Sequence, residues 1–292
     1  MSELSVISGK SSESLAKELS KKIKANLVKS EIRVFPDGES KITLIGKISK
    51  KKSIVVQSIY PPVDTNLVQA LSLITKAKEN SSEVIVVIPY MGYARQDREF
   101  LSGEIVTMKV LGKLFKGAGA SKVIVVDIHS LIGLKYFSIK TKNVTAIPDL
   151  VKYFKKLSLK DPLIVSPDQG GKNRAKEFAN EFNLDYIALE KTRDKKTGTV
   201  KIKTKNLKQV ENRDLILVDD MISTGGSIIK ATQFLKKQKC KKIYVACTHA
   251  LLMNDAEKKI RKAGVTSIIS TNTIPGKTSK VDISKTIAKA IM

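Results

Sequence analysis

Short runs of β-branched and other apolar residues recur along this chain, and amphipathic stretches separate several of them. The apolar runs cover residues 53–57, 84–88, 122–126, 163–165, 215–218 and 242–246. Between them, residues 67–78 and 227–237 place apolar side chains on one face at helical spacing. Strands that are apolar throughout and joined by helices are typical of parallel sheets covered on both faces. The sequence therefore predicts an α/β protein built from βαβ units.

The order of strand, polar loop, helix and strand occurs twice, over residues 53–88 and again over 214–246. Two such units predict two similar α/β domains, joined near residues 141–148. A chain of 292 residues is long enough for two domains of roughly 100–200 residues each.

The amino-acid composition limits the classes of protein to which this chain can belong. Lys and Arg number 53 against 28 Asp and Glu, a net charge of +25, which favours an anionic partner. Nucleic-acid readers concentrate charge and interleave aromatics, whereas here lysines are spread out and aromatics make up only 5%. No apolar run approaches the ~20 residues that cross a bilayer. Two cysteines, Cys240 and Cys247, are too few for a disulfide framework. We expect a soluble cytoplasmic protein that binds neither nucleic acid nor membrane.

Polar clusters follow four of the predicted strands, at residues 89–98, 127–130, 166–171 and 219–227. In open parallel sheets, ligands bind outside the carboxyl ends of the strands. These clusters therefore predict one functional edge on each sheet.

The last cluster has the clearest chemistry. Five residues lead directly into a predicted helix, where backbone N–H groups and hydroxyls can hold a phosphate: Ser223, Thr224, Gly225, Gly226 and Ser227. Two carboxylates, Asp219 and Asp220, stand just upstream. Paired acids beside an anion site can accept hydrogen bonds from sugar hydroxyls or help to hold a cation.

Residues 218–227 resemble the ribose-5-phosphate signature of type I phosphoribosyltransferases. The remaining motifs resemble those of the ribose-phosphate pyrophosphokinase family and occur in the same order, over almost the whole chain. They are Phe35-Pro-Asp-Gly-Glu39, Tyr93-Ala-Arg-Gln-Asp-Arg98, Asp127-Ile-His129, Ser166-Pro-Asp168 with Gly170-Gly171, and Lys191-Thr-Arg193. The resemblance implies two tandem phosphoribosyltransferase-like domains, each with a mainly parallel sheet flanked by helices. They would span residues 1–143 and 144–278, with residues 279–292 packing back on the first.

The activity that the resemblance implies is transfer of the β,γ-diphosphoryl group of MgATP to the 1-hydroxyl of ribose 5-phosphate. The products would be phosphoribosyl pyrophosphate, for nucleotide biosynthesis, and AMP. Mg²⁺ is the implied cofactor. Because residues 35–39 come from a neighbouring subunit in the family, a homodimer is the smallest working unit that the resemblance implies.

The resemblance also implies residue roles. Lys191 and Arg193 would be catalytic, and Arg193 would also contact ribose 5-phosphate together with Asp219, Asp220 and residues 223–227. The ATP site would comprise Phe35, Asp37, Glu39, Arg95, Gln96, Asp97 and Arg98. A diphosphate loop would comprise Asp168, Gln169, Gly170 and Gly171, and the metal would be held by His129 and Asp168.

Several positions depart from the family pattern, among them Ile128, where the family more usually has leucine, and the short lysine-rich segment after Arg193. Gln169 replaces a small apolar residue, Glu99 stands where the family often has a lysine, and Ser130 replaces the more usual alanine. Two other functions fit part of the chain. A purine or pyrimidine phosphoribosyltransferase would explain residues 219–227 but leave residues 35–39 and 93–98 without a role. A non-catalytic regulatory or nucleic-acid-binding relative would fit the positive charge.

Overall fold

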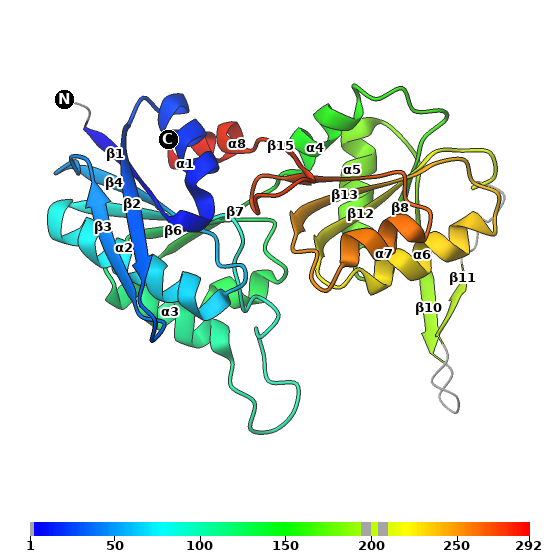
Figure 1. Ribbon diagram of the computed structural model, residues 1–292. Coiled ribbons are helices and arrows are strands. Elements are labelled where there is room, and N and C mark those ends of the chain that lie inside the picture. The colour runs from blue at the N-terminus through cyan, green and yellow to red at the C-terminus, as the bar shows by residue number, and fades with distance from the viewer. Residues whose placement is uncertain (1–2, 194–199, 204–209) are drawn as a thin grey trace. The chain divides into compact units, whose positions relative to one another are not determined.

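The computed structural model describes residues 3–193, 200–203 and 210–292, with the side chains of 191–193 and 200–203 left out (Figure 1). These residues form two compact units. Unit 1 comprises Met1–Thr145, Asn272–Pro275 and Asp282–Met292, and unit 2 comprises Ala146–Thr271 and Gly276–Val281.

Unit 1 contains a seven-stranded sheet in the order β3-β2-β1-β4-β5-β6-β7. Every neighbouring pair is parallel except β2 and β3, which form an antiparallel hairpin at one edge. The strands are β1 Leu4–Ser8, β2 Asn26–Val34, β3 Ser40–Ile45, β4 Lys52–Val56, β5 Glu83–Ile88, β6 Lys122–Val126 and β7 Lys140–Val144. The central strands β1, β4, β5 and β6 are almost wholly buried, as parallel strands covered on both faces must be.

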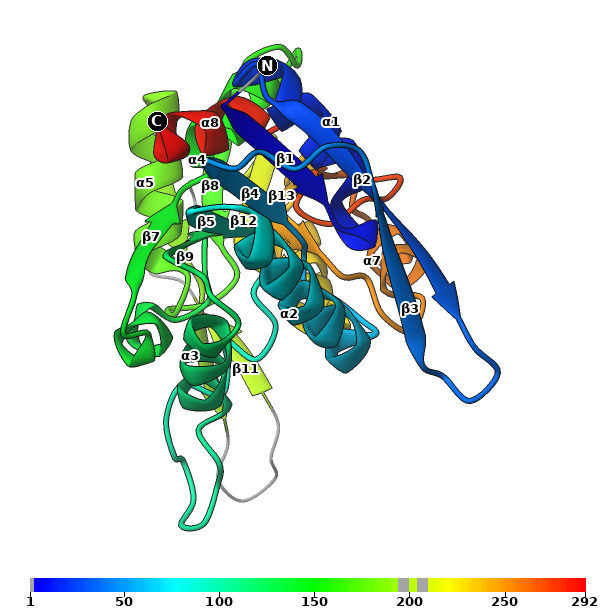
Figure 2. The same ribbon diagram turned by 90° about the vertical axis from the view of Figure 1, so that its left-hand side faces the viewer.

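Helices cover both faces of this sheet (Figure 2). On one face, α2 (Val63–Asn80) and α3 (Thr107–Gly117) bury Leu73, Ile74 and Phe115 against the strands. On the other, α1 (Glu13–Lys22), which follows the 3-10 turn η1 (Lys10–Ser12), packs against α8 (Ser284–Ile291). A second 3-10 turn, η2 (Leu131–Tyr136), follows β6.

The end of the chain is part of unit 1. Besides the packing of α8 on α1, the Lys122 ammonium donates to the Ala290 carbonyl at 2.8 Å. The Ser58 hydroxyl donates to the Thr273 carbonyl at 2.6 Å. Unit 1 is therefore assembled from the two ends of the chain.

Unit 2 contains a six-stranded, all-parallel sheet in the order β15-β14-β13-β12-β8-β9. Its strands are β8 Leu163–Ser166, β9 Tyr186–Ala188, β12 Leu215–Ile222, β13 Ile243–Ala250, β14 Ser267–Thr271 and β15 Ser279–Val281. Its helices are α4 Ile147–Phe154, α5 Lys172–Phe182, α6 Gly226–Lys236 and α7 Ala256–Lys262. A separate antiparallel pair, β10 (Glu190–Arg193) and β11 (Val200–Lys203), projects from the unit.

The predicted α/β class with mainly parallel sheets is confirmed. All six predicted strands exist, with ends shifted by up to four residues. The largest shifts are in β12, which was predicted to stop at Val218 but continues to Ile222, and in β13, which was predicted to stop at Ala246 but continues to Ala250. The parallel pairing of β12 with β13 extends to Ile222 and Ala250, so Asp219 and Asp220 lie within strand β12. No helix among the described residues is long and apolar enough to cross a membrane.

Candidate functional site

The turn from β12 to α6 in unit 2 has the geometry of an anion-binding loop. Gly225 is the N-cap of α6 with φ +77°, a left-handed conformation that glycine adopts without strain. A Cβ at Gly225 would lie 2.7 Å from Ile260 Cδ1. Because a glycine N-cap has no side chain to satisfy the first-turn N–H groups of the helix, an anion can do so.

A second glycine loop leads into α5 from the adjacent strand β8. The Ser166 hydroxyl donates to the Asp168 carbonyl at 2.6 Å, and the Gly171 N–H donates to Asp168 Oδ1 at 3.3 Å. A Cβ at Gly171, the N-cap of α5, would lie 2.7 Å from Ser166 Oγ. Since β8 and β12 are neighbours, the loops 168–171 and 223–227 lie at the same edge of the sheet.

The acid pair of β12 lies beside this edge and is balanced by an arginine. Arg174, in the first turn of α5, places Nη1 3.3 Å from Asp220 Oδ1 and 3.8 Å from Asp219 Oδ1. Burial and the charge of Asp220 raise the pKa of Asp219 to about 8, although Arg174 opposes the shift. The two acids share the Arg174 guanidinium, and the pair favours holding one proton near neutral pH. Sequence reasoning missed Arg174, whose only signal is its place three residues after Gly171.

We expect Asp219→Asn to raise the free energy of unfolding at pH 8 by on the order of 1–2 kcal/mol. Between the ordinary carboxyl pKa of 3.8 and about 8, folded Asp219 keeps a proton that the unfolded chain has lost. The native state then binds more protons, so wild-type stability falls as pH rises across this window. Urea unfolding of the ligand-free wild type and variant at pH 5 and pH 8 measures how the free energy of unfolding of each protein depends on pH. Equal stability of variant and wild type at pH 8 would contradict this origin of the shift.

In unit 1, the segment after β5 lines a cavity of about 640 Å³. Three predicted ATP-binding residues line it, Arg95, Gln96 and Arg98, together with Phe100, Gly103, Glu104, Ile105 and Thr107. Asp97, predicted beside them, is not among the lining residues because its carboxylate is turned inward and only 3% exposed.

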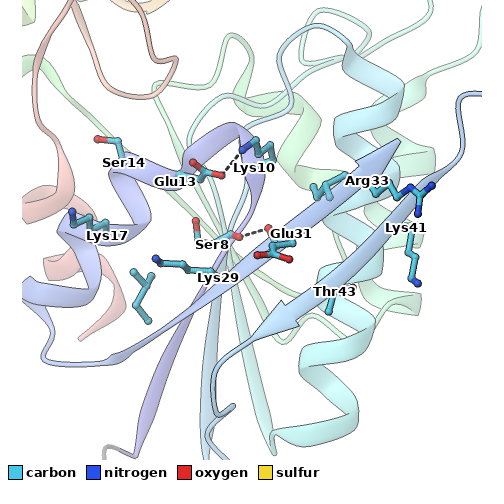
Figure 3. A pocket seen from close by; sticks show the side chains of 13 residues that line it. Ser8, Lys10, Glu13, Ser14, Lys17, Lys29, Glu31, Arg33, Lys41 and Thr43 are labelled. Carbon is cyan, nitrogen blue, oxygen red and sulfur yellow. Dashed lines mark hydrogen bonds and ion pairs between the residues drawn. The ribbon is translucent and has the colours of Figure 1, made fainter. Parts of the chain in front are cut away.

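Residues 35–39 form the turn of the β2–β3 hairpin. The Phe35 N–H donates to the Glu39 carbonyl at 2.8 Å, and the Glu39 N–H donates to Asp37 Oδ1 at 3.1 Å. Asp37 and Glu39 are exposed, and none of the three lines the 640 Å³ cavity. A further cavity of about 890 Å³ between α1 and the hairpin contains no predicted site residue (Figure 3).

Lys191 and Arg193 lie in β10, opposite Ile202 and Val200 of β11. Their side chains lie outside the part of the chain that the structure describes, as do residues 194–199. The structure therefore places their backbone on a projecting hairpin and nothing more.

The two predicted metal ligands belong to different units, His129 on the turn after β6 and Asp168 in the loop before α5. Among the described residues, no three His, Cys, Asp or Glu side chains are grouped to hold a metal ion. Mg²⁺ is commonly bound by one or two carboxylates together with substrate phosphates. The Asp168 carboxylate fits an ion of that kind, whereas the His129 imidazole is a poor direct ligand for it.

A parallel sheet with an acid pair and a glycine loop at its carboxyl edge defines unit 2 as a phosphoribosyltransferase fold. Residues 144–282 match the phosphoribosyl transferase domain model, and residues 4–119 match the N-terminal domain of ribose phosphate pyrophosphokinase. The chain belongs to the ribose-phosphate pyrophosphokinase family, as its motifs predicted, and is an enzyme.

Individual relatives match this chain over nearly its whole length. Ribose-phosphate pyrophosphokinase from Sulfolobus acidocaldarius is 37% identical over 290 residues, covering 98% of this chain and 99% of the relative. The protein of that name from Methanopyrus kandleri is 37% identical over 279 residues, covering 95% and 94%. The crystal structure of phosphoribosylpyrophosphate synthetase from Mycobacterium smegmatis superposes with a TM-score of 0.86 at 26% identity, covering 99% and 97%. The full-length match favours this family over a phosphoribosyltransferase acting on nucleobases.

Proposed function

We propose that this enzyme transfers the β,γ-diphosphoryl group of ATP to the 1-hydroxyl of ribose 5-phosphate, forming phosphoribosyl pyrophosphate and AMP. The observation that carries the proposal is the pairing in unit 2 of two glycine-capped helix N-termini with a buried acid pair. That pairing suits a sugar with a phosphate at one end and a diphosphate at the other. The relatives' name, pyrophosphokinase, supplies the reaction class. Both substrates are intracellular metabolites, so we place the protein in the cytoplasm.

The ribose 5-phosphate is held at the β12–α6 turn. Residues 223–227 bind the 5-phosphate through backbone N–H groups and hydroxyls, helped by the positive end of α6. Asp219 and Asp220 accept hydrogen bonds from the ribose hydroxyls. The loop of Asp168, Gln169, Gly170 and Gly171 receives the diphosphate that forms at the 1-position, where Gln169 adds an amide donor.

The ATP is held by unit 1, which we propose as the nucleotide domain of residues 1–143. Arg95, Gln96 and Arg98 line the 640 Å³ cavity, where the two arginines offer charged forks to the phosphates and Gln96 offers a neutral amide. Phe35, Asp37 and Glu39 reach the adenine from a neighbouring copy of the chain, so that a homodimer is the smallest active form. Their position at an exposed hairpin turn supports this assignment.

In the reaction, the ribose 1-oxygen forms a bond to the β-phosphorus while the bond from that phosphorus to the α,β-bridging oxygen breaks, and the hydroxyl proton is released. Lys191 and Arg193 stabilise the charge that spreads over the β-phosphoryl oxygens. Mg²⁺ supplies charge neutralisation on the phosphates when it is bound. Asp168 would hold the ion through its carboxylate, and His129, a poor direct ligand, would contribute through water.

The test is to incubate the protein with ATP, Mg²⁺ and ribose 5-phosphate and to measure AMP and phosphoribosyl pyrophosphate. We expect equal amounts of both, and neither product when ribose 5-phosphate is omitted. Release of pyrophosphate from phosphoribosyl pyrophosphate and a nucleobase, without AMP formation from ATP, would instead indicate a phosphoribosyltransferase. Salt-sensitive DNA binding without AMP would indicate a binding protein.

A further inference from the structure

We propose that Ser130 and Tyr136 are positioning residues of the ATP site, which fix the Arg98 guanidinium through the buried Asp97. The inference rests on the proposed function, because it assigns a task to residues that surround the proposed nucleotide cavity. Neither residue lines that cavity, so each acts through its neighbour.

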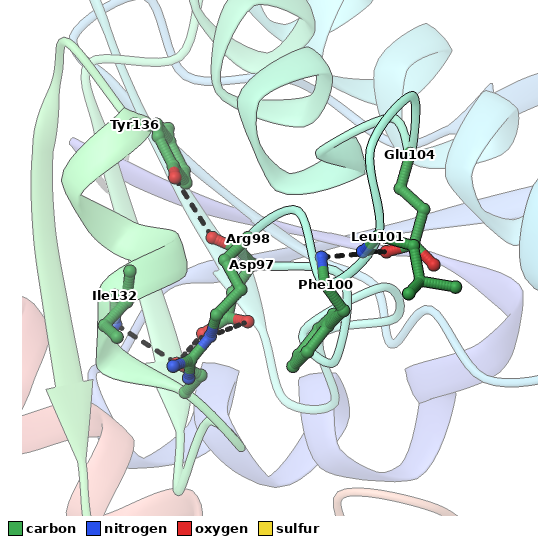
Figure 4. A network of polar contacts seen from close by, with 8 residues as sticks. Asp97, Arg98, Phe100, Leu101, Glu104, Ile132 and Tyr136 are labelled. Atoms are coloured by element: carbon green, nitrogen blue, oxygen red, sulfur yellow. Dashed lines mark hydrogen bonds and ion pairs between the residues drawn. The ribbon is translucent and has the colours of Figure 1, made fainter.

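Asp97 is the centre of a polar network (Figure 4). Arg98 donates from Nε to Asp97 Oδ1 at 3.2 Å and from Nη2 to Oδ2 at 3.3 Å. The Ser130 hydroxyl donates to the same Oδ2, and the Tyr136 hydroxyl donates to the Asp97 main-chain carbonyl at 3.0 Å. The carboxylate is 3% exposed, whereas the Arg98 side chain is 54% exposed. The Arg98 side chain is therefore bound on one side by the buried Asp97 carboxylate and is accessible from the cavity on the other.

The network joins two strand ends of the sheet. Asp97 follows β5, whereas Ser130 and Tyr136 follow β6 and belong to the turn that carries His129. Ser130 is also the N-cap of η2, and its Oγ accepts from the Ile132 N–H at 3.3 Å. Because Ser130 Oγ has one donor and one acceptor contact, its orientation is fixed. Asp97 thus links Arg98 to the turn that carries His129.

The Ser130 hydroxyl also affects the charge of the network. Burial opposes ionisation of Asp97, but the hydrogen bonds from Ser130 and Arg98 outweigh it and lower the pKa of the carboxyl below its ordinary value. Asp97 consequently stays anionic and keeps its hold on the guanidinium.

The other side of Arg98 is fixed by its own loop. Arg98 Cζ lies 5.4 Å from the centre of the Phe100 ring, within cation–π range. Glu104 Oε2 accepts from the Phe100 and Leu101 N–H groups at 2.9 and 3.2 Å, and Glu99 Oε1 accepts from the Gly103 N–H at 2.6 Å. Glu99 thus closes the loop between residues 99 and 103. An arginine held on both sides loses less rotamer freedom when it binds a phosphate.

The experiment compares Ser130→Ala, Ser130→Thr and Tyr136→Phe by steady-state kinetics and by calorimetric titration with ATP and Mg²⁺. For Ser130→Ala we expect the KM for ATP and the dissociation constant of ATP each to rise about tenfold. The reason is that the variant loses one hydrogen bond to a charged group. We expect kcat and the KM for ribose 5-phosphate to stay within twofold. Ser130→Thr keeps the hydroxyl and restores the wild-type values, and Tyr136→Phe gives a smaller rise in KM for ATP.

Ser72→Ala is the matched control, because this exposed serine on α2 bonds only within its own helix. Unchanged ATP affinity in Ser130→Ala and Tyr136→Phe would overturn the proposal. So would a fall in Tm with kcat and both KM values affected equally, which indicates a purely structural role. If the wild type makes no AMP, the proposed function fails. The ATP titration still decides whether Ser130 positions a nucleotide-binding arginine.

Discussion

Lys191→Ala is expected to lower kcat by about 10²–10³-fold while leaving the affinity for ribose 5-phosphate within about threefold. Phosphoryl transfer depends on positioning and on neutralising the charge that grows on the transferred group. A lysine point charge that contacts those oxygens only in the transition state contributes to turnover rather than to sugar binding. Steady-state kinetics, with a separate calorimetric titration of ribose 5-phosphate, distinguish the two effects.

The matched control is Lys176→Ala, which removes one positive charge from an exposed position on α5 in the same unit. We expect its kcat to match the wild type, so that a general effect of net charge is excluded. Preserved turnover with weakened sugar binding in Lys191→Ala would show that Lys191 holds ribose 5-phosphate and is not catalytic.

Gly225→Ala is expected to raise the KM for ribose 5-phosphate by about 10–100-fold, the cost of one misplaced charge-assisted hydrogen bond. The φ of +77° strains any residue with a Cβ, and that Cβ would meet Ile260 Cδ1 at 2.7 Å. The turn can relieve the backbone strain and the close contact with Ile260 only by shifting. This shift moves the N–H groups of residues 225–227 away from the 5-phosphate. The KM for ATP should change much less.

Gly276→Ala serves as the control for this glycine. It lies in unit 2 with an unstrained φ, and nothing lies within 4 Å of the position its Cβ would take. Its kinetics and Tm should equal those of the wild type. An unchanged KM for ribose 5-phosphate in Gly225→Ala would mean that the 5-phosphate binds elsewhere.

The parallel strands β4, β5, β6, β8, β12 and β13 were predictable because they are buried on both faces and therefore read as continuous apolar runs. The central strand β1, whose apolar run is interrupted by Ser5, was not among the predictions. The edge hairpin of β2 and β3 was not predictable in this way. In β3, half-buried and exposed positions alternate, and β2 carries Lys29, Glu31 and Arg33 on its open side, so neither contains an apolar run. The end of β12 was missed for the opposite reason, since its acids look like a loop but remain in the parallel ladder.

The candidate site was predictable as far as residue type and strand position decide it. The glycine loops 168–171 and 223–227 do lie at neighbouring strand ends. The direction in which each side chain of a polar cluster points could not be predicted from the sequence. Arg98 lines the cavity whereas its neighbour Asp97 is buried beneath it, and Arg174 reaches the acid pair from another element. Such directions follow from tertiary packing and not from spacing along the chain.

Because α8 belongs to unit 1, this unit depends on a segment that follows all of unit 2 in the sequence. Unit 2, which ends at Val281, has all its residues before unit 1 does. Domains usually mature in N- to C-terminal order during synthesis. Here the face of the unit 1 sheet beside α1 stays uncovered until α8 has been synthesised. Truncating the last nine residues should therefore leave unit 2 folded and make unit 1 prone to aggregation.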